Sequence, residues 1–201
     1  MSSWLNNMER KYGRYAIPDL TKIIIITYLI GYLLQFMGLT NFICLNPYLV
    51  VSRLQIWRVV SWILMPPSGL SIFTIIMLLF YYSIGSALER TWGAFRYNLY
   101  MFSGFLFTLI GAFGVYFIGN FLGIPGFLLG GFLAGYVTTY YINMSIFFAF
   151  AASYPDMQIL LYFIIPIKIK WIAILDAVYI VWELISMPWY GRVIVVMSLL
   201  N

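Results

Sequence analysis

The chain has 201 residues, of which 64% are hydrophobic and 8% are charged. A soluble domain carries about 25% charged residues, so the composition excludes a soluble globular protein and predicts one polytopic membrane domain. The net charge of +5 does not indicate nucleic-acid binding, because the basic residues lie in short connecting segments rather than in one patch. The chain has no histidine and one cysteine, so it lacks the commonest general base and cannot form an internal disulfide.

The first 20 residues form a polar segment in front of the first apolar one. Basic and aromatic side chains interleave in it: Trp4, Arg10, Lys11, Tyr12, Arg14 and Tyr15. This pattern is typical of an amphipathic segment that lies on the membrane surface. A frayed, positively charged tail would have the same composition, and the sequence does not decide between the two.

Apolar segments that approach the roughly 20 residues needed to cross a hydrocarbon core follow this segment. The predicted spans are residues 21–39, 70–88, 97–118, 127–154 and 171–185, with a partial sixth span at 193–201. Residues 127–154 are expected to form a short helix that leads into the fourth span. The run 193–201 is too short to cross the membrane, and we expect a sixth span of which this sequence holds only part rather than an interfacial segment.

The connecting segments are marked by proline and glycine. Residues 40–69 are rich in aromatic side chains and broken by Pro47, Pro66 and Pro67, so we expect them to lie in the membrane interface. The segment "GNFLGIPG" predicts a turn, and Pro155 and Pro166 exclude a continuous helix from the connector before the fifth span.

The distribution of basic residues predicts the topology. One side of the membrane receives the basic N-terminal segment, the connector with Arg90 and Arg96, and the connector with Lys168 and Lys170. The other side receives fewer basic residues: Arg53, Arg58 and Arg192. The positive-inside rule therefore predicts a cytoplasmic N-terminus.

Four motifs occur in a fixed order along the chain. The first outer loop holds "QIWRVVSW" with Trp57 and Arg58, and the second span ends in "GSALERTWG" with Gly85, Glu89 and Gly93. "RYNLYMFSG" opens the third span, and "AFAASYPD" and "IIPIKIKW" flank the connector before the fifth. Together they resemble the rhomboid family of intramembrane serine proteases along essentially the whole chain. Derlins, which are inactive relatives of rhomboids, share "QIWR" and the Leu-Glu pair.

The resemblance implies an all-α, rhomboid-like bundle of membrane helices, and the likeness to bacterial rhomboids implies a bacterial plasma membrane. The sequence also departs from that of active rhomboids at the catalytic positions. Active rhomboids open the fourth helix with Gly-x-Ser-Gly at a fixed distance before the proline that closes it, and the same distance before Pro155 leads to Tyr140. The family's histidine on the sixth helix has no counterpart here. Because a serine hydroxyl without an adjacent base is a poor nucleophile, the resemblance implies an inactive member.

Other routes to catalysis also fail on the sequence. Ser145 lies five residues after Tyr140 and faces a different direction on a helix, and Lys168 and Lys170 are predicted at the cytoplasmic face, away from it. Asp176 and Glu183 lie about 10 Å apart along one helix, which is too far to share a proton. We therefore predict no catalytic residue, no metal site and no cofactor.

The motif residues have structural interpretations beside functional ones. Trp57 and Arg58 form either an interfacial anchor or a wedge that distorts the surrounding lipid. Glu89 is expected to tie spans together through an ion pair or a hydrogen bond. The glycines of the second and third spans are expected to allow close helix approach: Gly85, Gly93, Gly104, Gly111 and Gly114.

Asp176 and Glu183 are the residues for which the sequence predicts a functional role. A carboxylate inside a span is costly and faces the protein interior, where it serves either structural hydrogen bonds or a polar groove that receives a client segment. The favoured function is a pseudoprotease that contacts membrane lipids and binds transmembrane segments of client proteins without cleaving them. The alternatives are an active serine protease with an atypical site and a small membrane transporter or lipid scramblase. The sequence leaves the oligomeric state open.

Overall fold

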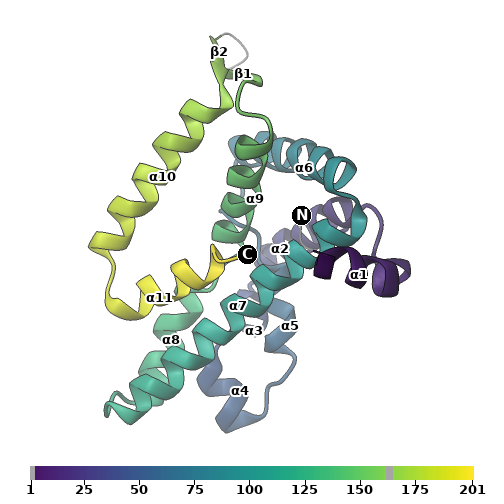
Figure 1. Cartoon of the computed structure of the whole chain (residues 1–201). Helices are drawn as coiled ribbons and strands as arrows, with labels where there is room; N and C mark the ends of the chain where they lie inside the picture. Colours follow the sequence, from purple (N-terminus) through teal and green to yellow (C-terminus); the bar gives the residue numbers. More distant parts are fainter. Residues whose placement is uncertain (1–2, 162–164) are drawn as a thin grey trace.

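The computed structural model describes residues 3–161 and 165–201, which form a helical bundle with one two-stranded hairpin (Figure 1). The all-α fold class is confirmed. Residues 1–2 of the predicted N-terminal segment and residues 162–164 of the predicted connector lie outside the described residues. In chain order the elements are α1 (Ser3–Tyr12), the 3-10 helix η1 (Gly13–Tyr15), α2 (Leu20–Phe36), α3 (Thr40–Ile43), α4 (Pro47–Arg53), α5 (Arg58–Ser61), the 3-10 helix η2 (Trp62–Leu64), α6 (Ile72–Trp92), α7 (Ala94–Phe121), α8 (Gly126–Tyr136), α9 (Tyr140–Ser153), β1 (Gln158–Leu161), β2 (Ile165–Lys168), α10 (Ile169–Ser186) and α11 (Trp189–Ser198).

Two helices in the described part of the chain, α6 and α7, are long and apolar enough to cross a membrane. A third crossing results if α2 and the N-terminal helices before it, which are bent by 58° relative to it, count as one broken span. The predicted spans 21–39 and 171–185 correspond in position to α2 and α10, and residues 127–154 form two helices, α8 and α9. The number of membrane crossings stays a prediction.

Helix boundaries follow local side-chain chemistry. Ser71 precedes α6, and its hydroxyl oxygen accepts a hydrogen bond from the amide of Thr74 at 3.2 Å. Asn46 caps α4 in the same way and accepts from the amide of Leu49 at 3.2 Å. Gly93 separates α6 from α7 with a φ of 85°, a conformation that favours glycine. Its role is to reverse the chain rather than to allow close helix approach.

The core of the bundle forms around α7, which packs against α6, α8, α9 and α11 (Figure 1). The largest fully buried side chains include Trp62, Tyr97, Met101, Leu133 and Ile194. Large apolar side chains on the outer faces of α2, α6, α7 and α10 are exposed, as expected for a protein whose solvent is lipid. In lipid the helices are held by close packing and hydrogen bonds rather than by exclusion of water.

Three of the glycines predicted to allow close helix approach do so. A Cβ atom added at Gly85 of α6 would lie 2.7 Å from the Thr21 side chain of α2. At Gly104 and Gly111 of α7 the nearest atoms, 2.8 and 3.0 Å away, belong to residues of α11 and the chain end. The expectation fails at Gly114, where no atom lies within 4 Å of an added Cβ.

The connector before α10 is a β-hairpin, which the sequence does not predict. Strands β1 and β2 pair antiparallel, from Gln158 opposite Lys168 to Leu161 opposite Ile165. The prolines exclude a helix here, and cross-strand pairing satisfies backbone groups that a helix would have satisfied internally. The hairpin stands at one end of the bundle (Figure 1), where the Tyr154 hydroxyl also hydrogen-bonds the hydroxyl of Thr91 at the end of α6.

Candidate functional site

The candidate site lies between α9 and α10. Helix α10 packs on α9 and α11, and most of its large apolar side chains are exposed. Glu183 is half-buried on α10, and its Oε1 accepts a hydrogen bond of 2.9 Å from the hydroxyl of Tyr141 in the first turn of α9. Its Oε2 is buried and has no hydrogen-bond partner among the described residues. Glu183 thus links the two helices with one oxygen and leaves one acceptor unused.

Asp176 lies on the same helix, two turns earlier. It is half-buried and makes no hydrogen bond to any of the described residues. Its carboxylate is within electrostatic range of Tyr140 at the start of α9 and of Tyr81 on α6. Asp176 therefore faces the tyrosine-rich start of α9 across the α9–α10 contact and has no hydrogen-bond partner of its own among the described residues.

The position of the missing nucleophile is occupied by an aromatic residue. Tyr140 opens α9 and is half-buried, and its ring lies edge-on to that of Tyr141 with centroids 5.1 Å apart. Ser145 is buried deeper along the same helix. Its hydroxyl donates to the carbonyl of Ile142 at 2.7 Å and accepts from the amide of Asn201 at 2.8 Å. None of these groups is a base that could activate a hydroxyl.

The two lysines that a Ser–Lys pair would need lie beyond the opposite end of α9. Lys168 and Lys170 bind the carboxylate of Asp156 at 3.0 and 3.4 Å, beside the hairpin. Hydrogen bonds from Lys168 and then Lys170 hold the pKa of Asp156 below its ordinary value. Among the described residues, no group of three or more His, Cys, Asp or Glu side chains could hold a metal ion.

A polar contact that sequence reasoning missed lies inside the bundle. Asn143 of α9 is buried and donates to the hydroxyl of Tyr28 on α2 at 2.9 Å. Thr139, also buried, donates to the carbonyl of Met65 at 2.8 Å. An asparagine inside an apolar run is itself a signal of an interior partner, and that signal could have identified Asn143. These contacts fix the start of α9, and with it Tyr140, against α2 and the segment between α2 and α6.

Arg58 and Trp57 have different environments. Arg58 is buried and donates to three oxygens of the segment between α2 and α6: Gln55 Oε1 at 2.6 Å, the Asn41 carbonyl at 2.6 Å and the Cys44 carbonyl at 2.9 Å. Trp57 is 51% exposed, and its Nε1 donates to the carbonyl of Phe42 at 3.2 Å. Arg58 therefore organises the loop from within, and Trp57 is the member of the pair that can meet lipid.

Comparison with known proteins identifies the family. The family model described as "Eukaryotic integral membrane protein (DUF1751)" matches residues 20–200. No curated protein and no solved structure matches the chain. The expectation of a bacterial plasma membrane is not supported, because this family is eukaryotic. The match spans most of the sequence, and the chain belongs to this family of eukaryotic integral membrane proteins.

Proposed function

We propose that this membrane protein is a rhomboid-like pseudoprotease that binds transmembrane segments of client proteins beside α10 without cleaving them. The sequence motifs support the rhomboid-like part of the proposal. Trp57 and Arg58 lie in an ordered loop between α2 and α6, Glu89 lies in the last turn of α6, and Tyr140 opens α9. These are the locations that the rhomboid resemblance implies for the corresponding motifs.

The binding proposal rests on the exposed apolar surface of α10 and on a carboxylate of α10 that has no hydrogen-bond partner in the described part of the chain. The outer surface of this helix exposes large side chains that include Tyr179 and Trp182, at 55% and 70%, while Asp176 on the same helix lacks a hydrogen-bond partner in the described part of the chain. An intramembrane carboxylate is costly unless it finds a donor. A client helix with a hydrogen-bond donor would supply one, and its apolar residues would cover the exposed surface of α10.

Glu183 has a different role in this proposal. Its bond to Tyr141 holds α10 against α9, so we assign it to the integrity of the site and Asp176 to the client. We infer that clients are not cleaved, because the nucleophile position holds Tyr140 and the hydroxyl of Ser145 bonds a carbonyl and an amide rather than a base. The chain also has no histidine.

The test is photo-crosslinking in native membranes. A photoreactive amino acid replaces Tyr179 on α10, and the matched control replaces Phe117 on α7, which is similarly exposed at 57%. We expect transmembrane proteins to crosslink to position 179 and much less to position 117. Since an interhelical hydrogen bond in a membrane contributes about 0.6 kcal/mol, and at most about 1.7, Asp176→Leu, which removes the acceptor, should lower the crosslinked fraction about threefold at unchanged thermal stability.

Equal crosslinking at both positions, or an Asp176→Leu variant that captures clients as before, would overturn the proposal. Glu183→Gln keeps an acceptor for Tyr141 and should change neither capture nor stability. Cleaved client fragments in the crosslinked material would instead favour an active protease. Lipid movement between leaflets in reconstituted vesicles, without any client, would favour a scramblase.

A further inference from the structure

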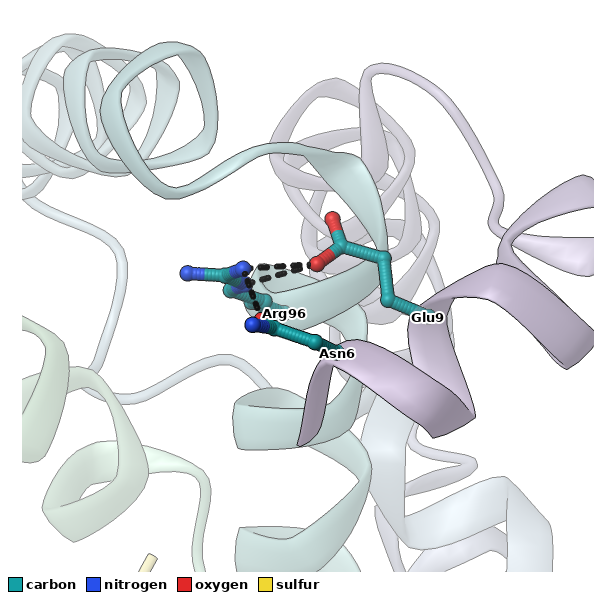
Figure 2. A network of polar contacts seen from close by, with 3 residues as sticks. All are labelled: Asn6, Glu9 and Arg96. Atoms are coloured by element: carbon teal, nitrogen blue, oxygen red, sulfur yellow. Dashed lines mark hydrogen bonds and ion pairs between the residues drawn. The ribbon is translucent and has the colours of Figure 1, made fainter. Parts of the chain in front are cut away.

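The N-terminal helices form a surface that the proposed function does not use. α1 is tied to α7 through Arg96 (Figure 2), and the residues that follow η1 are tied to α7 through Asn98. Glu9 of α1 accepts from Arg96 at 2.7 and 2.9 Å, and Asn6 accepts from the same guanidinium at 3.0 Å. The buried Asn98 donates to the carbonyl of Ile17 at 3.1 Å. The segment is therefore a docked helix rather than a frayed tail.

These ties decide which face of α1 points outward. Residues three apart on a helix share a face, so Asn6 and Glu9 together turn toward α7. Trp4 and Lys11, seven residues apart, share the face that points away, and Trp4 is 61% exposed. The ion pair to Arg96 also uses the one carboxylate of α1, so the outward surface of the helix is basic.

Basic and aromatic groups are combined on this outward surface. The ammonium of Lys11 lies 5.2 Å from the ring centroid of Tyr12, and the guanidinium of Arg14 lies 4.7 Å from that of Tyr15. Arg14 also donates to the hydroxyl of Tyr15 at 2.6 Å. Both tyrosines are exposed, as is Arg10. Aromatic rings favour the headgroup level of a bilayer, and cations favour anionic headgroups.

We propose that the outward face of α1 and η1 binds anionic phospholipid headgroups of the membrane in which the protein is embedded. We call it the basic face, and it consists of Trp4 and Lys11 on the outward side of α1 and of the exposed side chains next to them, Arg10, Tyr12, Arg14 and Tyr15. Two arguments select lipid as the occupant. The chain enters the apolar helix α2 five residues after η1 ends, which keeps the face at the membrane boundary. Its exposed indole and phenol rings match the headgroup region rather than bulk water.

The basic face therefore contacts lipid headgroups, and the ion pair between Glu9 and Arg96 fixes its orientation. Each basic residue near an anionic membrane contributes about fivefold to the binding equilibrium, from about 1 kcal/mol per cation. Three cations of the basic face therefore contribute about a hundredfold together. This inference stands independently of client binding, because it involves none of the residues near α10.

The experiment uses the full chain in lipid nanodiscs. In a Cys44→Ser background, a fluorophore attached at Asn7→Cys, an exposed position on α1, reports proximity to lipids brominated near the headgroup. We expect stronger quenching in a phosphatidylcholine–phosphatidylserine mixture than in phosphatidylcholine alone, and loss of the difference at 1 M salt, where the screening length is about 3 Å.

The variant that tests the assignment replaces Arg10, Lys11 and Arg14 by Gln together, and the matched control is Arg53→Gln, an exposed arginine of α4. The triple variant should lose the phosphatidylserine-dependent quenching, and the control should keep it. Equal quenching in the two lipid mixtures with the unsubstituted basic face would overturn the proposal, whether or not the triple variant folds. Salt-sensitive binding of heparin with no response to phosphatidylserine would assign the face to a soluble polyanion and would also overturn it.

Discussion

The carboxylate of Glu89, in the last turn of α6, accepts a hydrogen bond of 3.2 Å from the amide of Leu20, the first residue of α2. The Thr21 hydroxyl lies 3.5 Å from the other oxygen of Glu89 and donates to the hydroxyl of Tyr97 on α7 at 2.9 Å. Asp19 stands at the N-cap of α2, but its side chain makes no capping bond. A carboxylate from another helix therefore caps α2 and joins it to α6.

Glu89→Ala should destabilise the protein by about 1–2 kcal/mol, because it removes a helix cap and leaves the amide of Leu20 without its acceptor. Glu89→Gln keeps an acceptor oxygen and should cost less. Thermal unfolding of the purified protein in nanodiscs measures both. Arg90→Gln, at the exposed neighbouring position, is the control and should be near neutral. Equal stability of Glu89→Ala and Arg90→Gln would refute this role.

Gly85→Ala and Gly114→Ala form a second matched pair. At Gly85 a Cβ would lie 2.7 Å from Thr21 and 2.8 Å from the hydroxyl of Tyr97, so the helices must separate, at a cost of about 1–3 kcal/mol. At Gly114 the added methyl group meets open space, and the higher helix propensity of alanine should stabilise by up to about 1 kcal/mol. Thermal unfolding should thus shift in opposite directions. A Gly85→Ala variant as stable as the wild type would contradict the close packing.

We expect no reaction of the purified protein with a fluorophosphonate probe. Ser145 is 3% exposed, and its hydroxyl bonds a carbonyl and an amide rather than a base. Gel fluorescence after incubation with the probe gives the readout, and an active serine hydrolase serves as the positive control. Labelling that disappears in Ser145→Ala would establish an atypical active site.

The N-terminal helix and the base of the hairpin should be reached from the same side of the membrane, and the α7–α8 turn from the other. Single cysteines at Asn7, Asp156 and Leu122, all exposed positions, test this in the Cys44→Ser background with a membrane-impermeant maleimide. Labelling in intact cells and after permeabilisation distinguishes the sides, and the positive-inside rule predicts that Asn7 and Asp156 are cytoplasmic. Opposite accessibility of these two sites would reject the topology.

Loss of the Glu9–Arg96 ion pair should loosen α1 without unfolding the bundle. The two side chains are 35% and 27% exposed, so the coupling should be on the order of the 0.2–1 kcal/mol measured for exposed pairs. Hydrogen exchange over residues 3–12 should accelerate in Glu9→Gln, and the charge exchange Glu9→Arg with Arg96→Glu should recover part of the protection. If Glu9→Gln leaves exchange unchanged, the contact in Figure 2 does not hold α1 in place.

The sequence predicts the helical elements well where apolar length and prolines define them. It predicts the break around Pro155 and Pro166 but not the hairpin, because pairing between β1 and β2 depends on two strands meeting in space. The hydrogen-bond partner of Glu183 could not be predicted from the sequence either, since Tyr141 lies 42 residues away along the chain. Helix length and charge are local properties that a sequence displays, whereas contacts between spans depend on how the helices pack.

The oxygens that surround Arg58 also determine how the loop between α2 and α6 responds to acidity. The guanidinium is held by the carbonyls of Asn41 and Cys44 and by the amide oxygen of Gln55, and it also donates to the sulfur of Cys44 at 3.6 Å. Carbonyl and amide oxygens take up no proton at the pH of any cellular compartment, and an arginine side chain does not lose its proton in proteins. The loop should therefore keep one conformation in neutral and in acidic compartments, whereas a carboxylate at position 55 would have made its shape depend on pH.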